Sequence, residues 1–328
     1  MVLKVGVIGS SQHAQRHALG YNLDSRAEVL GIAAHTNLDR ARKVGEEVGA
    51  EMVTLNYRDL LDSPQIEAVS IVTPTYLHAK MAIEAAEAGK HVLCEKPMAI
   101  TANDCDEMVA AAKKAGVLLA VGFNYRFQSP FQRMKDLLEK KEIGRVVQAF
   151  VLRLHPNPYP FEQPWRTKRS TMGGFILSMD CHDIDMLRWL MGDIKSIKAE
   201  MKRLVYNEID YEDNGWLIFN FENGAIGALG SSMSCHMNIY EYVILGTTGT
   251  LKAHPYEKTV TLNNGKEERK ESLREEIHSV HREVSLFIDS IERGKIVEPL
   301  ASGEDGKTAN YVVESAYKSM QTGLTIRL

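Results

Sequence analysis

Residues 3–14, with the sequence LKVGVIGSSQHA, decide the fold of the first part of the chain. An apolar run ends at Ile8, and Gly9, Ser11 and Ala14 then fit the pattern Gly-x-Gly-x-x-Gly/Ala, with serine in place of the second glycine. Small residues at these places let the backbone approach a pyrophosphate, to which the following helix N-terminus presents partial positive charge. The Ser11 hydroxyl adds a donor for a phosphate oxygen. The predicted dinucleotide contacts from this loop are Gly9, Ser10, Ser11, His13 and Ala14.

Apolar runs then alternate with segments of helical periodicity up to about residue 121. Strands are predicted at Leu3–Ile8, Val29–Ala34, Ala68–Val72, Val92–Cys94 and Val117–Val121. Helices are predicted at Leu38–Val48, Ala79–Ala88 and Ala102–Ala115, each followed by a glycine. Because parallel strands need crossover helices on the sheet faces, residues 1–123 are expected to form a doubly wound α/β domain with a parallel sheet.

Beyond Asn124 the pattern changes to strand-like runs separated by turn signals such as Glu222-Asn223-Gly224 and Asn263-Asn264-Gly265. The runs are Val146–Leu154, Ile194–Leu204, Trp216–Phe221, Ala225–Ser232, Tyr240–Leu245 and Thr259–Leu262. They predict an α+β domain over residues 124–328, with a mostly antiparallel open sheet. Helices are expected to cover one face, including an amphipathic helix at Ile277–Ile291.

The composition is that of a soluble globular protein, with 328 residues, 44% of them hydrophobic and 25% charged. A formal net charge of −4 favours neither nucleic acid nor an anionic membrane as a partner, which leaves a small molecule. We find no signal peptide, no run long enough to span a bilayer and no Cys-x-x-Cys pair. Neither a disulfide framework nor a metal site is therefore predicted, and the expected compartment is the cytoplasm.

The second predicted strand ends in AHTN, residues 34–37, where a site that prefers NAD usually carries Asp or Glu for the ribose 2′-hydroxyl. This chain has no carboxylate there. The polar side chains offer hydrogen bonds to a 2′-phosphate, and Arg40 or Arg42 adds positive charge. We therefore predict that the protein prefers NADP(H) to NAD(H). The alternative interpretation is that these residues belong to an ordinary polar loop. The residues assigned to this contact are His35, Thr36, Asn37 and Arg40.

The run Val92–Pro97 ends in Glu95-Lys96-Pro97, so a lysine follows the carboxyl end of a buried strand. Ligands bind at that edge of an open parallel sheet. A solvated lysine before a turn proline is the alternative interpretation. The wider sequence context favours a functional Lys96.

A second group of polar residues, 178–185, leads into an apolar helix. Oxidation of an alcohol needs a base for the hydroxyl proton, and His182 is the leading candidate because its ordinary pKa is near neutrality. Asp185 lies three residues later, where it can face His182 on a helix, and Asp180 is a candidate substrate contact. A core or capping histidine is the alternative for His182.

Polar residues also interrupt the strand pattern at Arg153 and His155, and again at Trp165 and Arg166. Such loops suit a hydroxylated or carboxylated substrate, although a solvated connection is an equal alternative. Tyr125, Tyr159 and Phe161 serve equally well as packing residues.

Several motifs in the same order resemble those of the glucose-fructose oxidoreductase / inositol dehydrogenase / rhizopine catabolism (Gfo/Idh/MocA) family. They are Ile8-Gly9-Ser10-Ser11 with His17, Thr73-Pro74-Thr75 with His78, Glu95-Lys96-Pro97, Gly173-Gly174 leading to His182 and Asp185, and Pro299 to Gly306. The resemblance implies an N-terminal Rossmann domain and a C-terminal domain that binds substrate. It also implies NAD(P)-dependent hydride transfer at a sugar, inositol or similar hydroxyl, and homodimers or homotetramers paired through the C-terminal sheet.

The resemblance also implies roles for single residues. Lys96 would reach the reacting oxygen and the nicotinamide ribose, with a bond to Pro97 that is often cis in such proteins. The cofactor would be lined by Thr73, Pro74, Thr75, His78, Glu95, Lys96 and Pro97. The crossing into the second domain would supply Asn124, Tyr125 and Arg126. The chain departs from the family pattern Asp-x-Gly-x-His by carrying Ser178 and Asp180, which leaves Lys96 a larger share of the proton transfer.

The leading functional hypothesis is a dehydrogenase or reductase for a small polyhydroxylated substrate. A glycosidase that uses bound NAD for transient oxidation is a second hypothesis, and a cofactor-binding sensor without activity is a third. The presence of Lys96 argues against the sensor.

Overall fold

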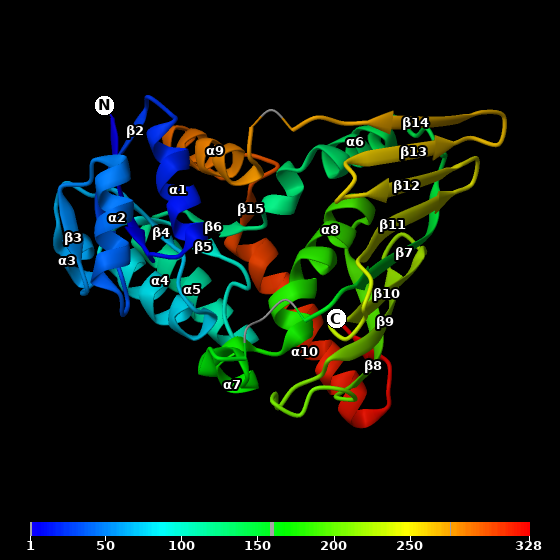
Figure 1. Ribbon diagram of the computed structural model, residues 1–328. Coiled ribbons are helices and arrows are strands. Elements are labelled where there is room, and N and C mark those ends of the chain that lie inside the picture. Colours follow the sequence, from blue (N-terminus) through cyan, green and yellow to red (C-terminus); the bar gives the residue numbers. More distant parts are fainter. Residues whose placement is uncertain (1, 158–160, 276) are drawn as a thin grey trace. The chain divides into compact units, whose positions relative to one another are not determined.

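A computed structural model of the chain describes residues 2–157, 161–275 and 277–328 (Figure 1). Its internal contacts define two compact units. Unit 1 contains Met1–Phe127 and Ile277–Thr308, and unit 2 contains Gln128–Glu276 and Ala309–Leu328. The sequence places every residue after 123 in the second domain, whereas these contacts group residues 277–308 with the first unit.

Unit 1 is built on a seven-stranded sheet in the order β15-β6-β5-β4-β1-β2-β3. All neighbours are parallel except β15, which pairs antiparallel with β6. The strands are β1 (Leu3–Ile8), β2 (Ala27–Ala33), β3 (Met52–Thr54), β4 (Ala68–Ile71), β5 (His91–Glu95), β6 (Leu119–Gly122) and β15 (Ala301–Ser302). The predicted doubly wound Rossmann fold is confirmed. The sequence missed β3, which is only three residues long.

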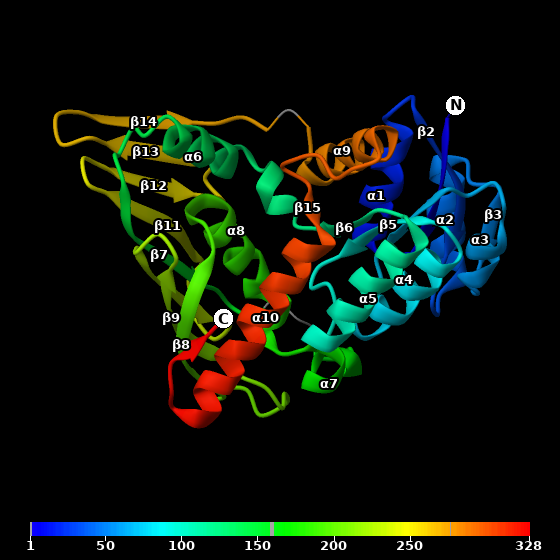
Figure 2. The same cartoon turned by 180° about the vertical axis from the view of Figure 1, so that it is seen from behind.

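Helices cover both faces of this sheet (Figures 1 and 2). On one face lie α1 (Gln12–Asn22), α2 (Leu38–Val48) and α9 (Ser279–Arg293), and on the other lie α4 (His78–Glu87) and α5 (Ala102–Ala115). The remaining short helices of unit 1 are α3 (Arg58–Asp62), η1 (Thr75–Leu77) and η2 (Asn124–Phe127). Gly49 and Gly116 end α2 and α5 in the left-handed conformation, as predicted.

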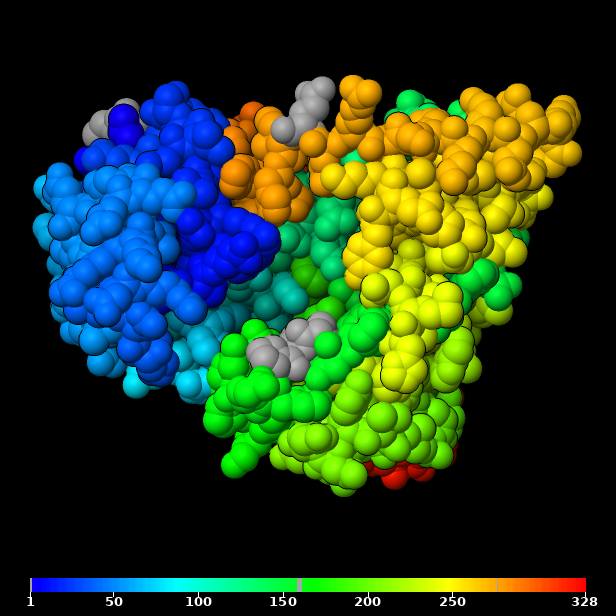
Figure 3. Space-filling view, in the orientation of Figure 1, coloured from blue at the N-terminus to red at the C-terminus, as the bar shows by residue number. Residues whose placement is uncertain are grey.

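The position of α9 corrects one expectation. The amphipathic helix predicted at residues 277–291 was expected to cover the second sheet, but α9 belongs to unit 1 and packs against α1. Its apolar stripe, which includes Val284 and Phe287, joins Ala18 and Tyr21 of α1 in one buried cluster. Figure 3 shows the orange atoms of this segment against the blue atoms of the N-terminal part. An amphipathic stripe indicates that a helix face is buried, but it carries no information on the partner.

Unit 2 contains a nine-stranded sheet in the order β14-β13-β12-β11-β7-β10-β9-β8-β16. Only β7 and β10 run parallel, so the predicted mostly antiparallel sheet is confirmed. The strands are β7 (Val146–Leu154), β8 (Ile194–Lys202), β9 (Asn214–Phe221), β10 (Ile226–Ser232), β11 (Ile239–Gly246), β12 (Thr250–His254), β13 (Thr259–Asn263), β14 (Glu268–Ser272) and β16 (Ile326–Arg327). The two predicted turns connect β9 to β10 and β13 to β14.

Helices of unit 2 cover one face of its sheet (Figures 1 and 2). They include α6 (Ser129–Glu139), which contacts β12 and β13, and α8 (Cys181–Met191), which contacts α6. The helix α10 (Gly303–Thr322) has residues in both units, and η3 (Pro164–Arg166), α7 (Arg169–Met172) and η4 (Ile176–Asp180) complete the set. Within the described part of the chain, none of the helices has both the length and the apolar character needed to cross a membrane.

Strand β9 shows how the unit 2 sheet separates its two faces. Leu217 and Phe219 are fully buried, while Trp216 and Ile218 between them are 54% and 52% exposed. Because side chains alternate along a strand, the buried residues share the face under the helices and the exposed ones share the other face. Large apolar side chains therefore lie on an uncovered sheet face of unit 2.

Candidate functional site

The loop between β1 and α1 has the geometry of a phosphate-binding turn. Gly9 has φ of +145°, and a Cβ at this position would lie 2.3 Å from the carbonyl oxygen of Val72. Ser11 caps α1, with its Oγ accepting a hydrogen bond from the Ala14 backbone nitrogen at 3.2 Å. The Ser11 hydroxyl proton remains available to a phosphate oxygen, and the first turn of α1 carries no acidic residue. These features fit an anionic dinucleotide.

The end of β2 presents the residues that were predicted to select the cofactor. His35, Thr36 and Asn37 are exposed, and Asn37 caps α2 by accepting from the Arg40 backbone nitrogen at 2.9 Å. The side chain of Arg42 contacts Asp39 at 3.1 Å, in a pair that is largely exposed. This end of the strand therefore presents polar and basic groups, with Asp39 as the neighbouring carboxylate.

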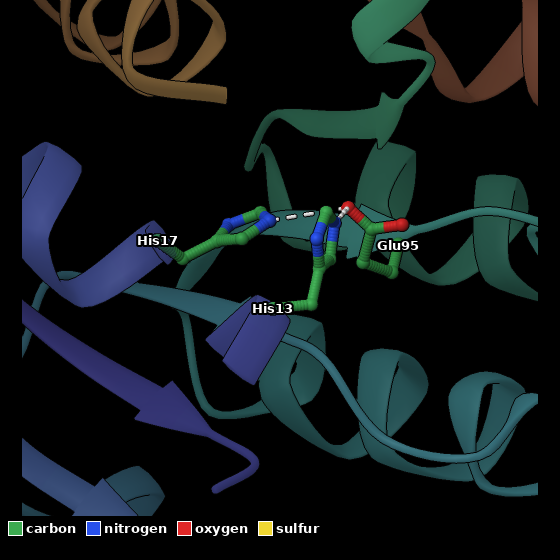
Figure 4. A group of neighbouring side chains, drawn as sticks. All are labelled: His13, His17 and Glu95. Atoms are coloured by element: carbon green, nitrogen blue, oxygen red, sulfur yellow. Dashed lines mark hydrogen bonds and ion pairs between the residues drawn. The ribbon is translucent and has the colours of Figure 1, made fainter. Parts of the chain in front are cut away.

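Glu95, the last residue of β5, connects this strand to α1 (Figure 4). Its Oε1 contacts Nε2 of His13 at 2.8 Å and Nε2 of His17 at 3.1 Å. Its Oε2 accepts a hydrogen bond from the backbone nitrogen of Lys96 at 3.1 Å. Burial alone would raise the pKa of Glu95, but the charge and hydrogen bonds of His13 and His17 outweigh it and hold this pKa well below its usual value. The carboxylate thus stays ionised and fixes the backbone of Lys96.

Lys96 itself is half-buried at the carboxyl end of β5, as the sequence predicts, and the Lys96–Pro97 peptide bond is cis. From the sequence, His17 was recognised only as part of the family motif, and its contact with Glu95 was not predicted. Its spacing of four residues from His13 was a signal that the two rings share one helix face.

His78, the first residue of α4, links two loops at the carboxyl edge of the sheet. Its Nδ1 lies 2.9 Å from the carbonyl oxygen of Pro97, and its Nε2 lies 2.8 Å from that of Thr73. Burial lowers the pKa of His78, although both carbonyls act in the opposite direction. The loops after β4 and β5, both assigned to the cofactor, therefore both contact one buried ring, which donates to one of the two carbonyls when it is neutral. Pro74 and Thr75 lie in the first of these loops.

The three residues predicted at the crossing lie in η2 of unit 1. Arg126 is 3% exposed and pairs with Asp305 of the same unit at 3.5 Å. Tyr125 is half-buried. The buried Oδ1 of Asn124 has no hydrogen-bond partner among the described residues, which leaves it able to accept from a ligand.

The segment around His182 begins with a turn that the sequence did not predict. Residues Ile176–Asp180 form a π-helix that leads directly into α8. Such wide turns are rare and occur frequently at functional sites. Glu212 holds the first residue of this turn, because its Oε1 accepts from the Ile176 backbone nitrogen at 2.9 Å and from the Tyr317 hydroxyl at 2.7 Å.

Ser178, Asp180, His182 and Asp185 are all buried in this segment. Asp180 is fully buried, and burial followed by the nearby Asp183 carboxylate raises its pKa well above the usual value. The ionised form of Asp180 is therefore disfavoured by its surroundings. Its carboxyl stands where the resemblance implies glycine.

Arg153 lies in a different environment from the one expected for a substrate contact. It is 2% exposed on β7, and its Nη1 pairs with Oδ2 of the fully buried Asp183 at 2.7 Å. Asp183 also accepts hydrogen bonds from the hydroxyls of Tyr240, at 2.8 Å, and Tyr242. Each charge of this buried pair is compensated inside unit 2, so the pair joins α8 to the sheet. The sequence missed Asp183, although a carboxylate on an apolar helix was a signal of a buried partner.

His155 follows β7 and is 5% exposed. Its Nδ1 is 2.7 Å from the carbonyl oxygen of Pro156, which fixes Nδ1 as the donor and leaves Nε2 as an acceptor. This Nε2 is buried and has no hydrogen-bond partner among the described residues. Burial lowers the pKa of His155, so the ring is held in its neutral form. A hydroxyl group of a ligand is a suitable partner for such an acceptor.

Trp165 and Arg166 are half-buried in η3, with the guanidinium carbon of Arg166 4.2 Å from the centre of the Trp165 ring. The Tyr211 hydroxyl donates to the carbonyl oxygen of Arg166 at 2.6 Å, which anchors this segment. Phe161 packs its ring against Tyr206, in line with the packing alternative. Tyr159 lies outside the described residues.

The glycine turn, the topology of unit 1 and the lysine after β5 define a nicotinamide dinucleotide-binding protein of the Rossmann class. Residues 3–123 match the family model for the oxidoreductase family with an NAD-binding Rossmann fold (GFO_IDH_MocA), and residues 131–252 match the GFO/IDH/MocA C-terminal domain. The chain belongs to the GFO/IDH/MocA family.

The chain is also similar along its length to individual relatives. It is 30% identical to the myo-inositol 2-dehydrogenase of Thermotoga maritima, with 99% of this chain and 98% of the relative covered. It is 27% identical to the D-glucoside 3-dehydrogenase of Escherichia coli, with 99% and 97% covered. Among solved structures, levoglucosan dehydrogenase in complex with NADH and levoglucosan superposes with a TM-score of 0.91 at 25% identity, covering 100% of this chain and 99% of that one.

The predicted enzyme class is confirmed. The protein is an NAD(P)-dependent oxidoreductase that transfers hydride between a nicotinamide cofactor and a small polyhydroxylated compound.

Proposed function

We propose that the protein oxidises or reduces one ring carbon of a sugar or inositol, with Lys96 as the principal acid/base residue. The observation that carries this proposal is the fixed position of Lys96 at the carboxyl end of β5, where Glu95 holds its backbone nitrogen at 3.1 Å. The nicotinamide accepts or supplies the hydride, and the protein positions the reactants and transfers the proton. A lysine held at the ligand-binding edge of the sheet suits the second task.

The cofactor-binding residues are proposed on the geometry of unit 1. The backbone after Gly9, the Ser11 hydroxyl and the N-terminus of α1 bind the pyrophosphate, with Ser10, His13 and Ala14 completing the turn. The two loops joined by His78 contact the nicotinamide half through Thr73, Pro74, Thr75 and the residues around Pro97. Of these groups, Ser11 and His78 are already oriented by hydrogen bonds.

For the cofactor we propose a preference for NADP(H) over NAD(H). The absence of a carboxylate at residues 34–37, together with exposed His35, Thr36 and Arg40, supports this preference. A hydrogen bond to a charged group is worth about 1.5 to 3 kcal/mol, so one arginine contact to the 2′-phosphate gives a preference of about tenfold or more. The ratio of kcat/KM for the two cofactors tests this, and a preference for NAD(H) would contradict it.

His182 and Asp185 are proposed as the second part of the proton relay. Both are buried on α8, directly after the π-helix, and burial raises the pKa of Asp180 just before them. Ser178 can hydrogen-bond but supplies no charge, so His182 lacks the aspartate that the family pattern places there. The relay therefore depends more on Lys96 in this chain.

Substrate contacts are proposed for groups that offer free acceptors or suitable surfaces. Asn124 and His155 each present a buried acceptor without a partner among the described residues, which suits ring hydroxyls. Tyr125 is a further hydroxyl contact, and Trp165 with its stacked Arg166 suits the apolar face of a sugar ring. Arg126 and Arg153 are held in internal ion pairs, so we assign them to supporting these groups.

We also propose that the protein acts in the cytoplasm as a homodimer or homotetramer. None of the four cysteines forms a disulfide, and three of them are buried, which suits a reducing compartment. The exposed Trp216, Ile218 and Ile226 lie on neighbouring strands of the unit 2 sheet and form an apolar surface for a second copy.

The direct experiment is a screen of inositols, sugars and keto-sugars with both cofactors in both redox states, followed by the absorbance of the reduced nicotinamide. We expect turnover with members of one of these groups. Turnover of none of them, with cofactor binding intact, would contradict the proposed substrate class.

A further inference from the structure

His13, His17 and Glu95 form a compact group of three potential metal ligands in unit 1 (Figure 4). The two histidines are four residues apart on α1, so both rings leave the same helix face. Figure 4 shows both rings directed at the same carboxylate oxygen, which comes from the end of β5. The ligand atoms all lie within 4.8 Å of one another.

The chemistry of this set matches an open zinc site. Two imidazole nitrogens and one carboxylate oxygen are a ligand combination that Zn²⁺ uses in sites with a fourth, exchangeable position. Zinc bonds of about 2.1 Å in a tetrahedral arrangement separate the ligand atoms by about 3.4 Å. To reach this separation, the present contacts of 2.8 Å and 3.1 Å to Oε1 would open by about 0.6 Å and about 0.3 Å, and ligand atoms that are now up to 4.8 Å apart would move closer.

The ligands are already oriented by neighbouring groups. Nδ1 of His17 lies 3.3 Å from the Ser70 hydroxyl, which in turn lies 2.9 Å from the Tyr21 hydroxyl. Such contacts hold the ring of a metal-ligating histidine in place and select the nitrogen that faces the metal. The other oxygen of Glu95 is held by the Lys96 backbone nitrogen.

The group also has space for a metal ion and a route by which the ion can enter. A Cβ at residue 122 would lie 2.6 Å from Oε1 of Glu95, so glycine at this position leaves room on that side of the oxygen. The side chain of His17 is 0% exposed and that of Glu95 is 8% exposed, while that of His13 is 32% exposed. His17 and Glu95 are therefore buried, and the partly exposed His13 gives an ion access from solvent.

We propose that His13, His17 and Glu95 bind one divalent transition-metal ion of the Zn²⁺ type. The proposed hydride transfer needs no metal, so metal binding would be an additional property of residues that also belong to the cofactor loop and hold Lys96. Cysteine spacing gave no sign of it, because none of its ligands is a cysteine. Since His13 belongs to the dinucleotide loop and Glu95 precedes Lys96, a bound ion would join these two segments through a third bond.

Calorimetric titration of ZnCl₂ into chelator-treated full-length protein tests the proposal. We expect one Zn²⁺ per chain, and a loss of affinity of about 100-fold or more in His13→Ala, because one of three ligands is gone. The control is His236→Ala, which removes an exposed histidine of unit 2 outside the group and is expected to bind Zn²⁺ like the unaltered protein. Co²⁺ serves as a second probe, because its visible absorption reports a four-coordinate site.

The outcome separates a metal site from a hydrogen-bonded group. Equal Zn²⁺ binding by the unaltered protein and His13→Ala, including no binding by either, would overturn the proposal. Thermal unfolding of each variant without metal shows whether the fold is intact. If His13→Ala does not fold, Glu95→Gln replaces it, since glutamine keeps an acceptor for the histidines but removes the anionic ligand. Glu95→Gln is also expected to lose Zn²⁺ affinity, and a Glu95→Gln protein that retains this affinity would overturn the proposal.

Discussion

At the scale of single residues, the conformation of the cofactor loop restricts which amino acid can occupy position 9. At Gly9 two separate constraints coincide, a φ of +145° and a distance of 2.3 Å from a potential Cβ to the Val72 carbonyl oxygen. Either constraint alone disfavours any other residue. The backbone of the loop can approach a pyrophosphate only because both are met.

We predict that Gly9→Ala weakens binding of the dinucleotide by about tenfold or more, since the added methyl group must displace the turn or Val72, which follows β4. Dissociation constants from calorimetry or from nicotinamide fluorescence measure this change. Gly49→Ala is the matched control, because Gly49 also has a positive φ of +73° but its Cβ would meet nothing within 4 Å. Unchanged cofactor affinity in Gly9→Ala would contradict this account of the loop.

The residue scale also shows the limit of sequence reasoning about the site. Position along a strand predicted Lys96, and a motif predicted Gly9 and Ser11, because both signals are local. The pairing of Arg153 with Asp183 was not predictable, since the two residues are 30 positions apart and meet only through the packing of α8 on the sheet. The same holds for Glu212, which holds the π-helix from a distant loop.

Whole elements were predicted well where their periodicity is strong. The bounds of β1, β7, α2 and α5 agree with the expected ranges, because each has a regular apolar pattern and a clear start or end. In contrast, β14 has the sequence ERKES and carries no apolar signal, so only pairing with β13 makes it a strand. The packing of α9 on α1 was missed because an apolar stripe on a helix does not show which element will cover it.

Polar contacts attach α9 to the turn before β2, and they give a testable dependence on pH. Asp24 accepts from Arg26 Nε at 2.9 Å and from the Ser285 hydroxyl of α9 at 2.8 Å. Arg26 also contacts Asp289 of α9 at 2.5 Å. The hydrogen bonds from Arg26, followed by that from Ser285, outweigh burial and lower the pKa of Asp24 from 3.8 to about 2.

We predict that Asp24→Asn lowers the free energy of unfolding by about 1 to 2 kcal/mol at neutral pH. Because the folded pKa is below the unfolded one, this contribution is complete above about pH 4 and is lost as the pH falls through about 2. Denaturant unfolding at several pH values measures it, and the difference between the two proteins should shrink on acidification. Asp39→Asn, in an exposed pair, is expected to change little. An identical pH dependence for Asp24→Asn and the unaltered protein would contradict the role of Asp24.

At the scale of the whole molecule, the family models match residues 3–123 and 131–252, a solved structure aligns over 100% of the chain, and both units have the expected class of fold. The composition predicted two domains, but a boundary chosen from a change in pattern could not show that residues 277–308 return to unit 1. That return depends on long-range packing. The uncovered sheet face of unit 2 likewise became visible only when the side-chain faces were known.

We predict that Trp216→Lys reduces the oligomeric state in solution, because a charge replaces an apolar side chain on the face proposed to pair. Light scattering after size-exclusion chromatography measures the molar mass at several concentrations. Leu23→Lys is the control, since Leu23 is 71% exposed and belongs to unit 1, not to that sheet. If the unaltered protein has a mass of twice 36.7 kDa or a higher multiple, and Trp216→Lys keeps that mass, the assignment of this face is wrong.

The central claim is that Lys96 transfers the proton that accompanies hydride transfer. The most direct measurement is kcat for Lys96→Ala with a confirmed substrate at saturating cofactor, together with the dissociation constant of the cofactor. We predict a loss of about 10² to 10⁴ in kcat, as expected for a positioned acid/base group, with cofactor affinity changed much less. A Lys96→Ala protein that turns over at the rate of the unaltered enzyme would contradict the account.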